Sequence, residues 1–239
     1  MLLSVIILFT DDDIHFLKRA VDSVKKGVKF LDYEIILVNN CEYDKSEIKI
    51  DNVKIISKGY NLYTFEGRRF GFENSKGDFI WNFDVDDLMI GELFKDDIKK
   101  DVDFIQMYYL YNPESRFNPL LTKRPPQVYG GNAWSRIYNR NILQKVYNCI
   151  NKPVKIFTFD DQILFDFVNS YKPKYEYIER PIYQYNVSNA TNRPENIKKN
   201  EKLLKIGLED YEYIYNILGK KYMAKELKNS IKKLLQGAK

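Results

Sequence analysis

Three carboxylates follow a short apolar stretch in the middle of the chain. Asp84, Asp86 and Asp87 come directly after residues 79–83, which are rich in aromatic side chains and preceded by Gly77. This pattern predicts a buried strand with its acids at the sheet edge where open α/β folds bind ligands. Clustered carboxylates repel one another unless a cation or a proton relieves them. Because Mg²⁺ combines one or two carboxylates with substrate phosphates, the stretch indicates a site for a metal-bound phosphate ester. A solvated turn that caps a helix is the alternative.

Acid–base chemistry in this chain falls mainly to carboxylates. The sole histidine, His15, lies in the expected first turn of an amphipathic helix, where a surface role is the commoner one. Cys41 and Cys149 lack the spacing of metal ligands. A second acidic pair, Asp160 and Asp161, opens a predicted helix, where carboxylates suit the positive end of the helix dipole.

The order of the predicted elements indicates an α/β fold. An apolar run at residues 4–9 precedes an amphipathic helix and a second apolar run, which is a βαβ start. Gly67 and Gly71 interrupt residues 63–75, but a helix that carries Arg68 and Arg69 fits there. Residues 113–131 are rich in proline and read as a long loop that serves as a lid or binding wall. The other expected elements are strands at 33–38, 53–57, 102–111, 134–138, 175–178 and 182–185 and helices at 14–24, 140–147 and 159–168.

Composition indicates one sizeable domain, or a domain with an appendage, in 239 residues. No apolar run has the length of a membrane span, and residues 2–9 are too short for a signal peptide, so we expect a cytoplasmic protein. The net charge of +5 comes from the tail, which contains eleven lysines and five acidic residues from Asn196 onward. A helical stripe of two segments is expected there. A lysine-rich solvated helix is the commoner reading, and contact with nucleic acid or a peripheral membrane contact is the alternative.

The middle of the chain resembles the family 2 glycosyltransferases. That family often shows an Asn, an Arg seven positions on and a Gly ten positions on, followed by a strand that leads into Asp-x-Asp-Asp. Asn61, Arg68, Gly71, Gly77 and residues 84–87 stand at these places without a gap. The resemblance covers roughly residues 2–190. It implies an α/β fold of the GT-A type, a nucleotide-diphospho-sugar transferase with a Rossmann-like mixed sheet, over residues 1–192. The tail lies outside the resemblance, and its apolar stripe predicts a helical C-terminal extension over residues 193–239.

The resemblance also implies how a donor would be held. Asp86, together with Asp84 or Asp87, would bind Mn²⁺ or Mg²⁺ on the diphosphate of a nucleotide sugar, with UDP the expected nucleotide. Arg68 would add a charge-assisted contact to the phosphates or support the nucleotide pocket. A surface arginine on a helix is the alternative for that residue.

Further site residues follow from the same resemblance. Asp161 would be the general base, with Asp160 as the near alternative, because the family places a Glu-Asp pair there. Trp134 would line the sugar or acceptor pocket, and a buried core tryptophan is the alternative. Asn40 stands where the family has the second acid of an Asp-Asp pair that reads the base, and an amide can still bond to a uracil edge. Thr10 replaces a more typical residue at the end of the first strand.

Some positions depart from the family pattern. Asn39 precedes Asn40 in place of the first acid, Tyr63 and Arg69 replace the usual Gly and Asn, and Asn186 stands where an Arg is frequent. An enzyme with altered donor choice would have such differences. A catalytically silent domain that binds a nucleotide would have them as well.

The sequence thus predicts a metal-dependent, inverting transferase that moves a sugar from a nucleotide-diphosphate donor to an acceptor hydroxyl. A glycan or a lipid-linked glycan is the first choice of acceptor, and hydroxymethylated bases of phage DNA are the alternative. A nucleotidyltransferase is disfavoured, because the acids after Thr10 would repel a triphosphate. The oligomeric state stays open.

Overall fold

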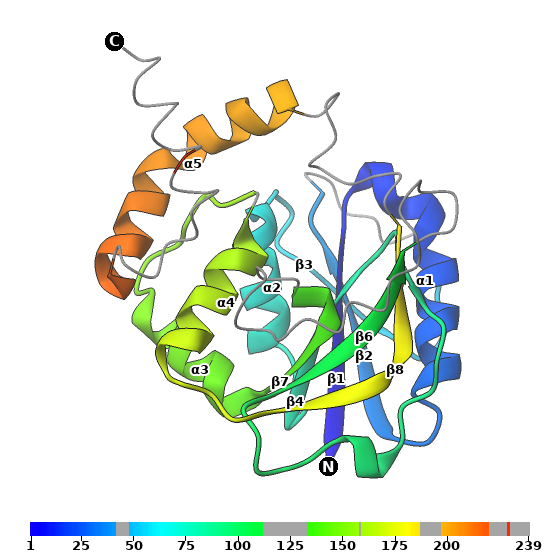
Figure 1. Ribbon diagram of the computed structural model, residues 1–239. Coiled ribbons are helices and arrows are strands. Elements are labelled where there is room, and N and C mark those ends of the chain that lie inside the picture. Colours follow the sequence, from blue (N-terminus) through cyan, green and yellow to red (C-terminus); the bar gives the residue numbers. More distant parts are fainter. Residues whose placement is uncertain (42–47, 112–132, 158, 187–196, 220–228, 230–239) are drawn as a thin grey trace.

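A computed structural model describes residues 1–41, 48–111, 133–157, 159–186, 197–219 and 229 (Figure 1). Its centre is an eight-stranded mixed sheet with the order β3-β2-β1-β4-β7-β6-β8-β5. The strands are β1 (Leu2–Phe9), β2 (Asp32–Asn39), β3 (Lys54–Ser57), β4 (Phe79–Asp84), β5 (Leu88–Met89), β6 (Phe104–Tyr111), β7 (Arg136–Asn139) and β8 (Tyr175–Tyr185).

The first half of the sheet is parallel and brings the ends of three strands to one edge. β1 lies between β2 and β4 and is parallel to both. In this register Phe9 pairs with Asn39, and Leu8 pairs with Asp84. The other half is mixed, since β7 is antiparallel to both β4 and β6, while β8 is parallel to β6. The carboxyl end of β4 therefore lies beside the carboxyl ends of β1 and β2.

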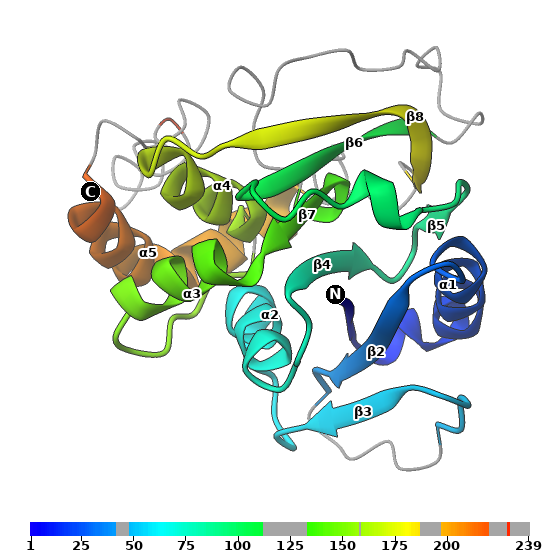
Figure 2. The same cartoon turned by 90° about the horizontal axis from the view of Figure 1, so that it is seen from below.

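Helices cover both faces of the sheet and create two apolar cores (Figures 1 and 2). Helix α1 (Ile14–Gly27) packs on one face, where Val5 and Ile7 of β1 meet Leu17 and Val21. Ile6 of β1 points to the other face, as expected from the alternation of side chains along a strand. That face carries α2 (Tyr63–Glu73), α3 (Arg140–Cys149), α4 (Asp160–Ser170) and α5 (Ile197–Leu218).

The two glycines of α2 allow the helix to lie close to β1. A Cβ atom added at Gly71 would come within 2.5 Å of Ile6 Cγ2, and one added at Gly67 within 2.5 Å of Leu8 Cδ1. Both glycines lie on one face of the helix because they are four residues apart. The helix expected over residues 63–75 is thus confirmed.

Most expected elements are present, with differences where pairing partners are distant in sequence. The two short strands predicted around Pro181 form one strand, β8, with irregular pairing to β6 at this proline, which has no N–H to donate. Trp134 lies in a 3₁₀ turn (Ala133–Ser135), and β7 begins only at Arg136. The two-residue strand β5 was not expected, because so short a segment has no periodic pattern.

The tail begins as an integral layer of the structure. Tyr211, Ile214 and Tyr215 of α5 are fully buried against the core that α3 and α4 share. The predicted boundary between residues 192 and 193 lies outside the described residues. The whole loop at 113–131 and most of the second tail segment lie outside them as well. Within the described residues, no helix combines the length and apolar character needed to cross a membrane.

Candidate active site

The turn after β4 separates the roles of its three acids. Asp87 is fully buried, its Oδ1 accepts a hydrogen bond of 2.6 Å from the Asn186 backbone N–H, and its Oδ2 accepts one from the Tyr183 hydroxyl. Burial, together with the nearby charges of Asp84 and Asp86, raises the pKa of the Asp87 carboxyl well above its ordinary value. Asp87 thus braces the turn from inside, so that Asp84 and Asp86 are the acids that keep partial exposure.

The backbone of Asp86 is fixed from two sides. Its carbonyl oxygen accepts a bond of 2.9 Å from Arg19 Nη2 of α1 and a longer one of 3.4 Å from Asn186 Nδ2. Asn186, which stands where the family often has an Arg, therefore contacts both Asp86 and Asp87. These contacts hold the turn in one conformation and leave the Asp86 carboxylate half-buried at the sheet edge.

Arg68 joins the acids of β4 to those of α4. Its Nη2 lies 3.1 Å from Asp84 Oδ1, and its Nε lies 3.0 Å from Asp160 Oδ2. The Arg68 side chain is 11% exposed and that of Asp160 is 9% exposed, so water screens this group weakly. Burial acts to lower the pKa of Arg68, but the carboxylates of Asp160 and Asp84 outweigh it and raise that pKa. Arg68 is therefore a permanent cation between two acids.

One arginine does not neutralise all the carboxylates at this edge. Burial raises the pKa of Asp84 to about 7, against the attraction of Arg68 and with the help of Asp86, Asp160 and Asp13. Burial raises the pKa of Asp161 to about 7 as well, and Asp160 adds to the shift. The site thus contains two carboxyls that change charge near neutral pH.

Helix α4 presents its acids from its first turn. Phe159, at the N-cap, has φ of 57° in the left-handed region and forms no side-chain cap. The chain thereby turns sharply into the helix, with Asp160 facing Arg68 and Asp161 Oδ1 accepting a bond of 2.8 Å from the Gln162 backbone N–H. Asp160 is buried, whereas Asp161 is half-buried.

The predicted residues of the first two strands lie at the same edge. The backbone and hydroxyl of Thr10 both donate to Asp13 Oδ2, at 2.8 Å and 2.7 Å. Asn40 is 3% exposed; its N–H bonds to the Phe9 carbonyl, and its Oδ1 accepts a bond of 2.6 Å from the Leu62 N–H. Asn40 therefore ties the ends of β1 and β2 to the residue before α2.

Tyr63, which replaces a glycine usual in the family that the sequence resembles, has a left-handed backbone conformation. Its φ is 63°, in the left-handed region that favours glycine. Asn61 Oδ1 accepts a bond of 2.8 Å from the Tyr63 N–H, and the Tyr63 ring packs edge-on against Phe157 with centroids 4.4 Å apart. These two contacts offset a backbone cost of about 1–2 kcal/mol.

Trp134 belongs to an aromatic stack next to the acid turn. Its ring is 6% exposed and lies parallel to both Tyr183 and Tyr185, with centroids 4.8 Å apart in each case. The Trp134 carbonyl accepts a bond of 2.6 Å from Trp81 Nε1. The burial favours the core alternative for Trp134, although Tyr183 connects it to Asp87.

Three site residues were missed as functional positions in the sequence. Tyr183 and Asn186 hold Asp87, and Arg19 holds the Asp86 carbonyl. The signal for Asn186 was its position, where an Arg is frequent in the family, and the signal for Tyr183 was only its place in the strand expected at residues 182–185. No pattern in the sequence connects Arg19 with a carbonyl 67 residues away.

The carboxylates after β4 fit a divalent cation whose coordination is completed by the phosphate oxygens of a bound ligand. Among the described residues, no three or more His, Cys, Asp or Glu side chains form a metal-binding group. Asp84 and Asp86 nevertheless give two oxygen-ligand carboxylates at one edge. Burial first, and then the negative charges of Asp86, Asp160 and Asp13, raise the pKa of Asp84, and a cation would relieve the part that comes from these charges. Two carboxylates completed by phosphate oxygens are a usual Mg²⁺ arrangement.

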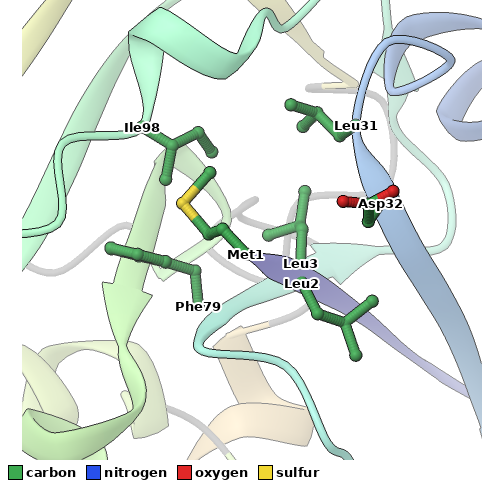
Figure 3. Close-up of a pocket in the computed structure, with 7 residues that line it drawn as sticks. All are labelled: Met1, Leu2, Leu3, Leu31, Asp32, Phe79 and Ile98. Atoms are coloured by element: carbon green, nitrogen blue, oxygen red, sulfur yellow. The ribbon is translucent and has the colours of Figure 1, made fainter.

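Two surface hollows lie at the other end of the sheet. One is lined by Met1, Leu3, Phe79 and Ile98 at the amino ends of β1 and β4 (Figure 3). A neighbouring hollow of about 290 Å³ includes Asp78 and residues 139–141. Phe79, which lines both hollows, and Asp84 are the first and last residues of β4 and lie five residues apart, which is about 17 Å along a strand. The candidate site is therefore distinct from both.

Comparisons with known proteins agree with this geometry. A sequence model described as glycosyl transferase family 2 matches residues 4–159. A crystal structure of S. aureus TarS 1–349 in complex with UDP has a TM-score of 0.62 at 19% identity, covering 92% of this chain and 70% of that one. The complex of the same protein with UDP-GlcNAc has a TM-score of 0.61 at 19% identity, covering 96% and 72%. Curated protein sequences gave no significant match. The expected GT-A type of α/β fold is thus confirmed.

Proposed function

This chain belongs to glycosyl transferase family 2, and on that basis we propose that it moves a sugar from a UDP-linked donor to an acceptor hydroxyl, with metal dependence and with inversion at the sugar carbon. The observation that carries the proposal is the meeting of Asp84 and Asp160 on Arg68. It joins the acids after β4 to the acids of α4 at one sheet edge. The UDP and UDP-GlcNAc complexes of TarS support the choice of donor.

The donor would be bound at the acid turn. We assign Asp84 and Asp86 to Mn²⁺ or Mg²⁺, which when bound neutralises the diphosphate leaving group. Asp87 keeps the bracing role that its two inward bonds give it. Arg68 orients Asp84 and adds positive charge near the phosphates. Asn40 and Thr10, at the ends of β2 and β1, are assigned to the nucleotide.

The acceptor would be activated by Asp161. Its carboxyl has a pKa of about 7, which matches a base that works near neutral pH. In the proposed step, the acceptor oxygen attacks the sugar carbon while Asp161 takes the hydroxyl proton, and the bond from that carbon to the diphosphate breaks. A single displacement of this kind inverts the configuration. Asp160 is less suited, because its carboxylate is paired with Arg68.

The acceptor is assigned by class. We propose a glycan or lipid-linked glycan, the common role of the family. Hydroxymethylated DNA bases are the second acceptor, motivated by the lysines of the tail. A domain that binds nucleotide without turnover is the alternative from another class, motivated by Asn39 and Asn40.

A nucleotide-sugar panel tests the proposal. Purified protein is melted with each nucleotide sugar in Mn²⁺ and in EDTA, and UDP release is measured in parallel. We expect one UDP-sugar to raise the melting temperature only with Mn²⁺ and to release UDP. Asp161→Asn should keep the melting shift and lose the turnover, whereas a wild type that is stabilised by UDP without any turnover would establish the silent alternative. Equal turnover in the Asp161 variant would refute the assignment of the base.

A further inference from the structure

A buried hydrogen bond joins the tail helix α5 to α4. The Tyr215 hydroxyl donates to Asp166 Oδ2 over 2.8 Å. Tyr215 is fully buried and Asp166 is 6% exposed. A tyrosine hydroxyl in the core needs a polar partner, and a buried carboxylate needs donors. The bond therefore satisfies both groups at once.

The same carboxylate leads on to the proposed base. Asp166 Oδ1 accepts a bond of 2.7 Å from Gln162 Nε2, one helical turn earlier in α4. The backbone N–H of Gln162 in turn donates to Asp161 Oδ1 over 2.8 Å. Three consecutive bonds thus run from Tyr215 through Asp166 and Gln162 to Asp161.

The first turn of α4 needs such support. Its N-cap, Phe159, forms no side-chain cap, and the next two residues are adjacent carboxylates. The N–H groups of this turn bond to its own acids instead, that of Gln162 to Asp161 and those of Asp160 and Asp161 to the Asp160 carboxyl. Two neighbouring carboxylates, of which only Asp160 contacts Arg68 in an ion pair, also repel each other. A fixed Gln162 side chain therefore stabilises the turn that carries Asp161.

Helix α5 is anchored independently of Asp166. Asp210 forms an ion pair of 2.8 Å with Lys152 and accepts a bond of 2.8 Å from the Lys155 N–H. A Cβ atom at Gly207 would lie 2.3 Å from the Lys155 carbonyl oxygen, so the helix lies directly on this segment. These contacts hold α5 on the segment that contains Lys152 and Lys155, so the placement of Tyr215 does not depend on its bond to Asp166 alone.

We propose that Tyr215 and Asp166 are positioning residues that hold Asp161 in its reactive orientation. This inference rests on the proposed role of Asp161 as the base. Both residues are buried, which places them away from a substrate at the surface. They act through Gln162 on the direction of one carboxylate, and small displacements of a reacting group are costly to rate. The tail helix, beyond the residues that match the family model, thereby becomes part of the machinery for transfer.

The test compares two tyrosines of α5. Tyr215→Phe removes the hydroxyl that bonds to Asp166, and Gln162→Met removes the side-chain amide that bonds to Asp166 while keeping the backbone N–H that bonds to Asp161. Tyr213→Phe is the matched control, because its hydroxyl bonds to Asn151 Oδ1 and N–H, away from α4. Hydrogen exchange of the peptides that contain residues 160–166 is measured by mass spectrometry for each variant. Initial rates of UDP release are measured with the donor that the panel identifies.

We expect Tyr215→Phe and Gln162→Met to speed exchange in residues 160–166 and to lower kcat about tenfold, with an unchanged KM for the donor. Tyr213→Phe should change neither quantity. Unchanged exchange in the Tyr215 variant, or faster exchange with an unchanged kcat, would overturn the inference. A fall in kcat for the Tyr213 variant as large as for Tyr215 would overturn it too, since the effect would then come from loosening of α5. A wild type without turnover refutes the proposed function, while the exchange measurement still tests the bond chain by itself.

Discussion

Replacing Asp161 with Asn is expected to make the metal-free protein more stable, although it removes the proposed base. Burial and the neighbouring Asp160 raise the pKa of Asp161 from 3.8 to about 7. At alkaline pH the Asp161 carboxylate is charged in both states, and burying this charge costs free energy in the folded state only. Asn keeps the Oδ1 atom that accepts the bond from Gln162, so the substitution removes charge and preserves shape.

The magnitude follows from the pKa difference. About three pKa units at about 1.4 kcal/mol each give an upper limit of about 4 kcal/mol. Because Asp160 and Arg68 readjust when the charge is removed, we expect about half, or about 2 kcal/mol at pH 8. For a chain of this length that corresponds to a rise in melting temperature of about 4–8 °C.

The stability gain of Asp161→Asn should increase with pH. A carboxyl whose pKa is higher in the folded state binds its proton more tightly there, so it destabilises the fold as the pH rises from about 4 to about 7. The gain of Asp161→Asn should therefore be complete at pH 8, fall below half at pH 5 and vanish near pH 4. Urea unfolding in EDTA at these pH values measures it.

The control for this experiment is an exposed acid. Asp22 forms a surface pair with Lys18 and is 54% exposed, so Asp22→Asn should change stability by less than about 0.5 kcal/mol at any of these pH values. If Asp161→Asn destabilises the protein at pH 8, or gives the same gain at pH 4 and pH 8, the reasoning from burial is wrong.

Three further predictions concern the same edge of the sheet. Asp86→Asn should abolish the Mn²⁺-dependent binding of a UDP-sugar in calorimetry, and retained binding would remove Asp86 from the metal site. Arg68→Met should lower the free energy of unfolding by about 3–5 kcal/mol. The loss should be larger at pH 8 than at pH 5, because Asp84 and Asp160 take up protons as the pH falls. A loss that does not depend on pH in urea titrations would contradict this prediction. Gly71→Ala should destabilise the fold by about 1–3 kcal/mol in the same assay, since the new methyl group would meet Ile6; a gain from helix propensity alone would show that α2 can move away from the sheet.

The sequence predicted the parts of the site that lie on periodic elements. The apolar run before Asp84 indicated a strand, and the acidic pair 160–161 indicated a helix start, because burial imposes a regular pattern on each segment. The edge of the sheet then followed from the parallel order of the strands. The pattern could not show which acids contact Arg68, since Asp84 is 16 positions and Asp160 is 92 positions away from it in the sequence.

The orientation of individual acids could not be predicted. Asp86 and Asp87 are neighbours of the same type, yet Asp87 turns inward to Tyr183 and Asn186. That choice depends on β8, a strand nearly a hundred residues later. In the same way the apolar stripe of α5 was visible in the sequence, but its bond from Tyr215 to Asp166 depends on how two helices pack.

The bonds to Asp87 have a consequence for the order in which the chain can assemble. The turn after β4 is synthesised early, but the donors that hold it, Tyr183 and Asn186, are 96 and 99 residues later. Contacts of such separation form late, because a long loop must close first. A nascent chain that ends before Tyr183 would therefore contain the acids of the turn without the two contacts that orient Asp87, and the proposed ion binding should be acquired only in the last stage of folding.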